Sequence, residues 1–317
     1  MARDFFTAPA TGQVPVSGSV ISDLQRSLNA LGGTLTVDGL YGKGTSKAIA
    51  DFQAAHGLPQ SGNVSDATWQ ALMRTPEPKI FDRCLQLVAS FEGTGFTLVV
   101  GNFDGAGITW GIIGFTLVNG ELGEVLQEIN QSHPDLIGTA FGHDADTILK
   151  ITGPATSEAD KTAWANSVSR GASSYNVAEP WKTYFHDLGT FREVQSIQVA
   201  RAKTKYWTIA MRDAGKLGIA EELDYLLVYD TAVQNGGLSK TRLGKVQDLI
   251  NEQHPKTAED KRKIIANVVA DSSSAKYRED VRSRKLTIAT GAGTVHGGKY
   301  QLAQWGFLDG QSTASAD

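Results

Sequence analysis

The sequence contains a single cysteine, Cys84, in 317 residues. One cysteine excludes an intramolecular disulfide framework and fits synthesis in a reducing compartment. Long hydrophobic runs are also absent, because no uninterrupted apolar stretch reaches the roughly 18 to 20 residues that cross a bilayer. We therefore expect a soluble chain with no membrane partner.

Basic charge is sparse as well. The 30 Lys and Arg residues are outnumbered by 34 Asp and Glu residues, and the basic residues form no cluster along the chain. A nucleic-acid binder needs a clustered basic surface to neutralise phosphates, so we exclude nucleic acid as a partner. The six histidines form no HxxxH or similar pair, and we expect neither a metal site nor another cofactor.

The N-terminal residues 1–18 are rich in glycine, proline, serine and threonine. They lack the basic start and the apolar core of a secretory signal. We predict a short flexible lead over residues 1–18, ahead of the first folded module.

Residues 19–74 show three helical patterns. The first begins at Ser22 or Asp23, the second opens at Thr45, and the third begins at Ser65 or Asp66. A module of about 60 residues with a small core suits a shallow binding surface better than a deep catalytic pocket. The side chains expected in its core are Leu24, Leu28, Leu31, Ala48, Ile49, Phe52, Trp69 and Leu72.

The segments LQRSLNALGG, VDGLYGKGTSKAIADFQAAHGL and SGNVSDATWQAL cover nearly this whole module. They resemble the peptidoglycan-binding domain found at the ends of many wall hydrolases. The resemblance implies bacterial peptidoglycan as a partner, with Asp38, Tyr41, Thr45 and Gln53 as binding residues. The alternative is that Asp38, Gly39, Tyr41 and Thr45 only shape a turn and cap a helix.

Two prolines at alternate positions mark residues 75–79 as a linker to a larger domain over residues 80–317. This domain opens with a helical pattern, KIFDRCLQLVASFEG, in which Cys84 lies on the apolar stripe and is expected to be buried. Glu92 occupies the last turn. The negative end of the helix dipole disfavours a carboxylate there, which suits a general acid. The alternative for Glu92 is a solvated side chain at a frayed helix end.

The next segment, FTLVVGNFDGAGITWGIIGFTL, alternates β-forming residues with glycine turns and predicts a hairpin or small sheet. Asp104 lies at its bend, where the chain turns back toward the helix that carries Glu92. A pair of carboxyls ~6.5 to 9.5 Å apart serves hydrolysis with inversion, and ~5 to 5.5 Å serves retention. Taken alone, Asp104 also fits a plain Asp-Gly turn.

The combination FEGTGF followed by FDGAGITWGIIGF resembles the catalytic signature of the chitosanases of glycoside hydrolase family 46, which are relatives of lysozymes. The resemblance implies that Glu92 is the general acid, Asp104 the general base and Thr109 the hydroxyl that orients the attacking water. The interval between the two carboxylates is shorter here than in the chitosanases. This difference bears on the substrate more than on the chemistry.

The stretch LVYDTAVQNGG resembles the YDxxVxxG segment of the same family. Asp230 lies between apolar residues of a helix and needs a cationic partner if it is buried. Arg282 and Arg284 are the candidates. The pair either supports the helix that carries Glu92 or is a purely architectural salt bridge.

Further helical patterns predict a mainly α protein with a small β-sheet, a lysozyme-like α+β catalytic domain beside a three-helix module. The expected helices are Ser157–Ser169, Val194–Met211, Glu222–Gln234, Thr241–Gln253, Ala258–Val269 and Ala275–Ala289.

Together these patterns predict a phage-type endolysin, a monomer that hydrolyses the glycan strands of peptidoglycan. We expect it in the host cytoplasm until lysis and then in the periplasm and cell wall. Two enzymatic alternatives are a chitosanase and a lytic transglycosylase that uses Glu92 alone. Chitosan is a polycation, whereas residues 79–317 carry 25 basic and 28 acidic side chains, too balanced for a strongly acidic cleft. A non-catalytic wall-binding protein is the third class considered.

Overall fold

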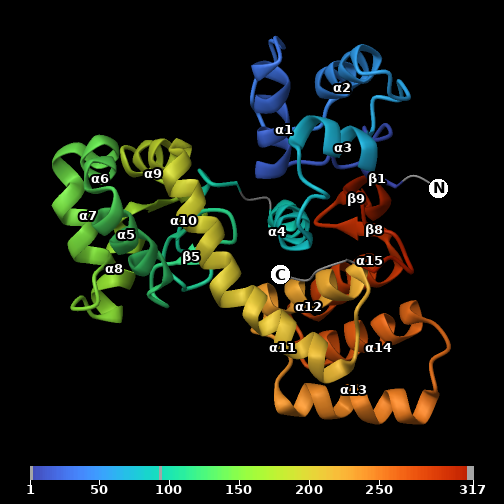
Figure 1. Cartoon of the computed structure of the whole chain (residues 1–317). Coiled ribbons are helices and arrows are strands. Elements are labelled where there is room, and N and C mark those ends of the chain that lie inside the picture. Colours follow the sequence, from blue (N-terminus) through green and yellow to red (C-terminus); the bar gives the residue numbers. More distant parts are fainter. Residues whose placement is uncertain (1–2, 93–94, 313–317) are drawn as a thin grey trace. The chain divides into compact units, whose positions relative to one another are not determined.

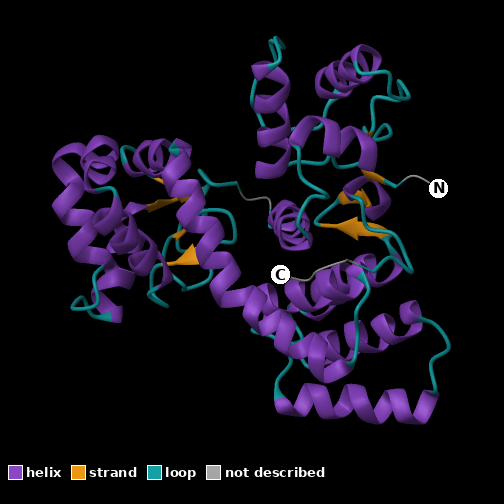
Figure 2. Cartoon of the chain, in the orientation of Figure 1, coloured by secondary structure: helices purple, strands orange, loops and turns teal. Residues whose placement is uncertain are grey.

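The computed structural model describes residues 3–92 and 95–312. The chain forms two compact units, one made of Met1–Phe91 with Lys205–Asp317 and the other of Glu92–Thr204. Both units are mainly helical, and the strands of the described residues form small two- and three-stranded sheets (Figures 1 and 2). The expected fold class, mainly α with small β-sheets, is confirmed. Within the described residues, no helix combines the length and the apolar character that crossing a membrane requires.

The N-terminal module, residues 3–74, contains the three expected helices. Ser65 caps the third one, since its hydroxyl accepts a hydrogen bond from the backbone N–H of Thr68 at 3.3 Å. Trp69 and Leu72 are buried as expected, but Leu31 follows the first helix and its side chain is 60% exposed. The elements are β1 (Asp4–Phe6), α1 (Ser19–Ala30), α2 (Lys43–Ala55), β2 (Val64–Ser65) and α3 (Asp66–Met73).

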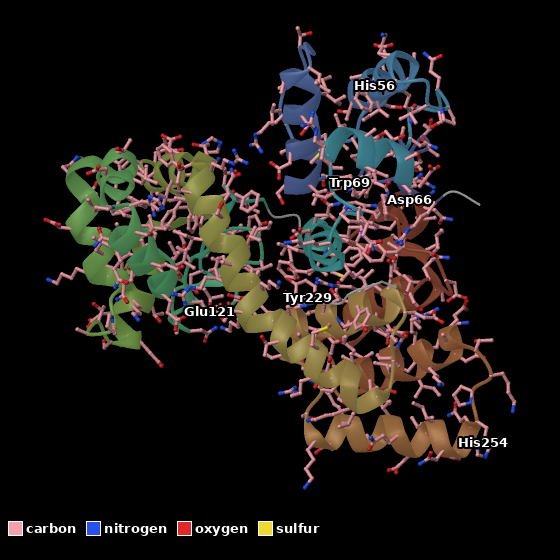
Figure 3. All side chains as sticks on the ribbon, viewed as in Figure 1. His56, Asp66, Trp69, Glu121, Tyr229 and His254 are labelled. Carbon is pink, nitrogen blue, oxygen red and sulfur yellow. The ribbon has the colours of Figure 1, made fainter. Side chains whose placement is uncertain are left out.

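The segment before α1 is not the flexible lead that its composition predicts. Strand β1 pairs antiparallel with β2, and Phe5 and Phe6 are fully buried. Both rings contact the indole of Trp69, labelled in Figure 3, with centroids 6.3 Å apart. Further along, Gln13 forms a parallel bridge with Lys299 near the other end of the chain. The apolar burial of two phenylalanines thus outweighs the glycine and proline content of this segment.

The first unit also contains α4 (Ile80–Phe91) and the C-terminal lobe, which we define as residues 205–312. Helix α12 (Glu222–Asn235) contacts α4, α11, α14 and α15 and is buried along most of its length. Its bounds match the expected helix to one residue. The remaining elements are α11 (Thr208–Leu217), α13 (Lys240–Gln253), α14 (Ala258–Asp271), α15 (Arg278–Thr290), β8 (Ala292–Val295), β9 (Gly298–Gln301) and η3 (Leu302–Trp305).

The prediction of a single helix over Val194–Met211 is wrong in one respect. The chain forms α10 (Arg192–Ala202), then a π-helix over Lys203–Trp207, and only then α11. No proline or glycine marks this change, so local sequence gives no signal for the wider turn.

The second unit, Glu92–Thr204, contains the small sheet expected from the glycine-rich segment. Strand β4 (Thr109–Trp110) lies between β3 (Val99–Val100) and β5 (Phe115–Thr116), with both pairings antiparallel. Besides α10, further helices and a second sheet, which has two strands, complete the unit. They are α5 (Glu121–Ser132), α6 (Pro134–Phe141), η1 (Gly142–Asp144), α7 (Ala145–Thr152), α8 (Glu158–Val168), β6 (Ser169–Arg170), β7 (Asn176–Val177) and α9 (Trp181–Thr190).

Candidate active site and the groove of the N-terminal module

Glu92 directly follows the last residue of α4 and is half-buried. Gly93, the expected helix stop, lies outside the described residues. The helix itself is buried on almost all sides, and Cys84 is fully buried as expected. Burial raises the pKa of its thiol, which leaves it a packing side chain and not a nucleophile.

Side chains from the C-terminal lobe hold the end of α4. The last carbonyls of a helix have no partner within it, and here two of them find one. The Tyr300 hydroxyl donates to the Ser90 carbonyl at 3.0 Å, and His296 Nδ1 lies 2.8 Å from the Phe91 carbonyl. The other ring nitrogen of His296 lies 2.8 Å from Asp280 Oδ1. The backbone immediately before Glu92 is therefore anchored.

Asp230 is fully buried and paired, as its position in an apolar helix requires. Its Oδ1 lies 2.6 Å from Arg284 Nη2, and its Oδ2 contacts the ammonium of Lys285. Burial alone would raise the pKa of Asp230, but these two cations hold it below its ordinary value. Arg284 is thus the partner, while Arg282 pairs with surface carboxylates instead. The Arg284 guanidinium also lies 5.2 Å from the centroid of the Phe91 ring, in the last turn of α4.

A second buried ion cluster lies earlier on α4. Glu222 is fully buried and accepts two hydrogen bonds from Arg83, at 2.6 and 3.0 Å. Arg3 of the N-terminal module pairs with the same carboxylate, and both guanidiniums donate to the Gly306 carbonyl. The sequence interpretation missed this cluster, although an arginine inside the apolar pattern IFDRCLQLV is a signal for it.

Asp104 lies in the exposed loop between β3 and β4. Its Oδ1 accepts a hydrogen bond from the backbone N–H of Ala106 at 3.0 Å, which is the arrangement of an Asx turn. Thr109 begins β4, is half-exposed and pairs with Thr116 across the sheet. The loop therefore fixes the carboxylate that the sequence predicts as a base while leaving it open to water.

A buried glutamine, which the sequence interpretation missed, fastens the same sheet to α10. Gln198 Oε1 accepts the backbone N–H of Ile112 at 2.9 Å, and its amide donates to the Phe96 carbonyl at 3.2 Å. Gly111 has a φ of 89°, and a Cβ there would lie 2.5 Å from Gln198 Oε1. The glycine is needed both for its backbone conformation and for this close approach.

Three of the four expected peptidoglycan-binding residues are buried. The Tyr41 hydroxyl donates to the Gly62 carbonyl at 2.7 Å, and burial raises its pKa. Thr45 donates to the Leu40 carbonyl at 2.9 Å, and Gln53 donates to the Asn63 carbonyl at 2.7 Å. These side chains have no free surface to offer a ligand, so their assignment as contact residues is corrected. They hold the loops of the module in place.

Asp38 is exposed but serves the same architecture. Its Oδ1 accepts from the Gln25 side chain at 2.8 Å and from the Leu40 backbone N–H at 2.9 Å. Gln25 also donates to the Thr45 hydroxyl at 3.0 Å. The turn interpretation therefore describes Asp38, but the expected helix cap at Thr45 is wrong. Helix α2 begins two residues earlier, at Lys43, without a side-chain cap, and the Thr45 hydroxyl donates to the Leu40 carbonyl instead.

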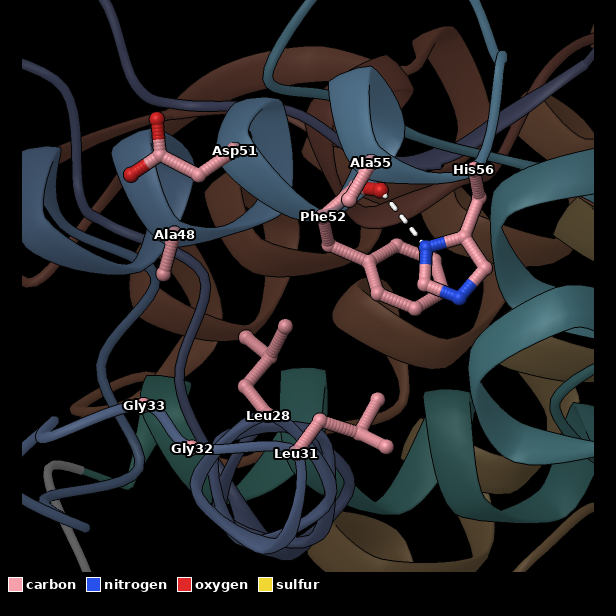
Figure 4. A pocket seen from close by; sticks show the side chains of 9 residues that line it. All are labelled: Leu28, Leu31, Gly32, Gly33, Ala48, Asp51, Phe52, Ala55 and His56. Atoms are coloured by element: carbon pink, nitrogen blue, oxygen red, sulfur yellow. Dashed lines mark hydrogen bonds between the residues drawn. The ribbon is translucent and has the colours of Figure 1, made fainter.

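The module nevertheless has a groove of about 320 Å³ between α1 and α2 (Figure 4). The ring of His56 stacks on Phe52 with centroids 4.0 Å apart, and its Nδ1 lies 2.9 Å from the Phe52 carbonyl. Leucine side chains of the α1 end face this pair across the groove. The lining residues are Leu28, Leu31, Gly32, Gly33, Ala48, Asp51, Phe52, Ala55 and His56.

Comparison with known proteins agrees with both halves of this description. Residues 17–72 match the family described as putative peptidoglycan binding domain, and residues 87–268 match glycosyl hydrolase family 46. The second match covers more than half of the chain, so the protein is a glycoside hydrolase. It belongs to glycosyl hydrolase family 46. A search of curated proteins finds no match.

The solved structures that match this chain include two chitosanases. The family 46 chitosanase of Gynuella sunshinyii in complex with chitotetraose is 20% identical, covers 66% of this chain and 84% of its own, and has a TM-score of 0.44. The native chitosanase of Bacillus subtilis is 16% identical, covers 69% of this chain and 95% of its own, and has a TM-score of 0.47.

Proposed function

We propose that this protein is a phage-type endolysin that hydrolyses the glycan strands of bacterial peptidoglycan. The observation that carries the proposal is the joining, on one chain, of a putative peptidoglycan binding domain with a family 46 hydrolase sequence. A domain that retains the enzyme on the cell wall raises the local concentration of its substrate if that substrate is part of the wall. The proposal implies release from the host cytoplasm to the cell wall at lysis.

In the proposed reaction, Glu92 gives its proton to the glycosidic oxygen as the bond to the anomeric carbon breaks. Asp104 takes a proton from a water molecule, whose oxygen forms the new bond to that carbon. The anchored end of α4 supports the first role, and the exposed Asx turn supports the second. Thr109 would orient the water.

The groove between α1 and α2 is the proposed contact with the wall. Its leucine, alanine and phenylalanine lining suits the alanine side chains of the peptide stems, and the exposed imidazole of His56 adds a polar ring to that lining. Asp51 pairs with Lys47 at 2.6 Å on the exposed face of α2, and the free amine of a diamino acid in the stem would replace that partner. We expect Leu31→Asp to weaken sedimentation with insoluble peptidoglycan, and Leu40→Asp, at a 44% exposed leucine outside the groove, to leave it unchanged.

Chitosan hydrolysis is the second candidate, favoured by family 46 membership and by the resemblance of FDGAGITWGIIGF to the chitosanase signature. The near balance of acidic and basic residues in the catalytic part gives no special attraction for a polycation.

Product analysis tests the proposal. Wild type, Glu92→Gln, Asp104→Asn and the exposed control Asp135→Asn are each incubated with purified peptidoglycan, and the released fragments are identified by mass spectrometry. We expect reducing ends from wild type and control, and a loss of at least about a hundredfold in the first two variants.

The other outcomes have definite meanings. Anhydro sugars in place of reducing ends would show transglycosylation. Full activity in Asp104→Asn would remove the role of Asp104 as the base. Cleavage of chitosan without release of wall fragments would establish the second candidate. Equal behaviour of wild type and Glu92→Gln would exclude catalysis by Glu92.

A further inference from the structure

Two large aromatic side chains lie exposed beside the proposed base. Phe103 directly precedes Asp104 in the β3–β4 loop and is 50% exposed, and Tyr175 directly precedes β7 and is 47% exposed. Their ring centroids are 5.4 Å apart and their planes are inclined by 51°. The two rings come from different hairpins of the same unit and form one continuous aromatic surface, which we call the aromatic platform.

Backbone contacts hold the two hairpins together beneath the aromatic platform. The N–H of Gly101 donates to the Tyr175 carbonyl at 2.7 Å, and the N–H of Asn102 donates to the Ser169 hydroxyl at 2.8 Å. The approach is so close that a Cβ on Gly101 would lie 2.2 Å from the Ser174 carbonyl oxygen. The platform is thus built on fixed backbone, and its rings need little reorganisation to receive a ligand.

Exposure of such side chains is uncommon in this protein. Within the described residues, the exposed large hydrophobic side chains include three aromatic ones, which are Phe103, Tyr175 and Tyr277. The first two contact each other, whereas Tyr277 lies near the ammonium of Lys276. An exposed aromatic pair indicates a binding surface more strongly than one isolated ring does.

We propose that Phe103 and Tyr175 stack on a sugar ring of the glycan substrate, at a binding subsite next to Asp104. A pyranose has an apolar face of C–H groups that fits an aromatic ring, and its rim of hydroxyl and amide groups needs polar neighbours. Here the side-chain amides of Asn102 and Asn166 lie beside the platform and are hydrogen-bonded to each other at 2.7 Å. These groups fit a chain of pyranose sugars, and the proposed function makes it an amino-sugar chain. This inference rests on the proposed function, because the platform lies beside the reacting sugar only if Asp104 is the catalytic base.

The test separates binding from catalysis. Full-length Glu92→Gln is titrated calorimetrically with peptide-free hexamers of N-acetylglucosamine and of glucosamine, alone and combined with Phe103→Ala or Tyr175→Ala. Tyr277→Ala, 49% exposed and distant in sequence, is the matched control. We expect each platform variant to weaken binding of at least one hexamer about tenfold, and the control to bind like the parent.

Kinetic measurements distinguish a loss of stacking from a change in the position of Asp104. In the otherwise wild-type chain we expect Phe103→Ala and Tyr175→Ala to raise KM on the polymer about tenfold with little change in kcat, and Phe103→Trp to restore KM. If Glu92→Gln binds neither hexamer, or if the platform variants bind and turn over like Tyr277→Ala, the inference is wrong. Platform-dependent binding in a protein whose wild type cleaves no glycan would uphold the platform and overturn the proposed function instead.

Discussion

Replacing Arg83 by methionine tests the buried cluster that joins α4 to the C-terminal lobe. The guanidinium makes two hydrogen bonds to Glu222 and one to the Gly306 carbonyl, all within 3.0 Å, and both side chains are fully buried. Methionine keeps most of the apolar volume of the side chain. The substitution therefore removes the charge and the hydrogen bonds, while Arg3 stays as the second cation beside Glu222.

Loss of one partner from a buried ion pair costs about 3 to 5 kcal/mol, because the other charge stays desolvated. Arg3 still compensates part of the Glu222 charge, so we expect the lower end, about 3 kcal/mol. At roughly 2 to 4 °C per kcal/mol, that lowers the melting temperature by about 6 to 12 °C. The double variant Arg83→Met with Glu222→Leu should lose less stability than Arg83→Met alone, since no carboxylate is then left buried.

The loss of stability in Arg83→Met depends on pH, and the environment of Glu222 determines the direction of that dependence. Burial alone would raise the pKa of Glu222, but Arg83 and then Arg3 hold it below its ordinary value. A carboxylate with a depressed pKa stabilises the fold above its ordinary pKa of about 4.3, and this contribution is lost as pH falls through the lower, folded value. In Arg83→Met the protonated form of Glu222 becomes favourable at higher pH. The stability difference between wild type and variant should therefore shrink below about pH 5.

Urea unfolding followed by tryptophan fluorescence, at pH 7 and at pH 4.5, measures both effects. The control is Arg26→Met, which breaks a half-exposed pair with Asp23 and should change stability by less than about 1 kcal/mol. A change of less than about 1 kcal/mol for Arg83→Met at pH 7 would refute the reasoning. So would a difference that does not diminish at the lower pH.

Three further substitutions or treatments have definite expected results. Asp230→Asn leaves two cations buried without their carboxylate, so we expect a loss of about 3 to 5 kcal/mol in urea unfolding; an unchanged midpoint would contradict the pairing. Cys84 is fully buried with a raised pKa, so iodoacetamide should label it, by mass spectrometry, only in denaturant; rapid labelling of the native protein would contradict its burial. In Gly123→Ala the new Cβ would lie 2.1 Å from the Thr152 carbonyl oxygen. We expect thermal circular dichroism to show a destabilisation of about 1 to 3 kcal/mol. The control Gly138→Ala, where a Cβ on α6 meets no atom within 4 Å, should cause none.

Several helices were predictable because caps and apolar spacing act locally, whereas α5, α6, α7 and α9 were not predicted. Ser157 caps α8 by accepting a hydrogen bond from the Asp160 N–H at 3.1 Å, at the position where the sequence predicts the helix to start. The buried N-terminal strand was not predictable in the same way. The partners of Phe5 include Trp69 and the close backbone of Gly306, which are 64 and 301 residues away in sequence. No local pattern encodes contacts of that range.

The candidate site likewise contains some residues that local sequence predicts and others that it does not. Short motifs single out Glu92 and Asp104, and the Ala106 N–H fixes Asp104 locally. The side chains that fix the backbone before Glu92 come instead from a remote segment. Tyr300 and His296 cap the end of α4 from the β8–β9 hairpin. The pairing of Asp230 was predictable in kind, because a charge inside an apolar helix needs a partner. Which of the neighbouring basic residues would face it depends on the rotation of α15 and not on any local preference.

The wall-binding motif shows why a family signature is a poor guide to the contact surface. Tyr41, Thr45 and Gln53 direct their polar atoms to backbone or side-chain partners inside the module, so any substitution there first costs the shape of its loops. A signature built from such residues records how the module folds. On the proposed function, recognition depends on side chains that the fold leaves open. In the groove between α1 and α2, Leu31 and His56 lie outside the DGxYGxxTxxAxxxFQ pattern, whereas Ala48 and Phe52 belong to it. Two modules with the same signature can therefore differ in the wall chemistry that they bind, because the groove can change without any cost to the loops.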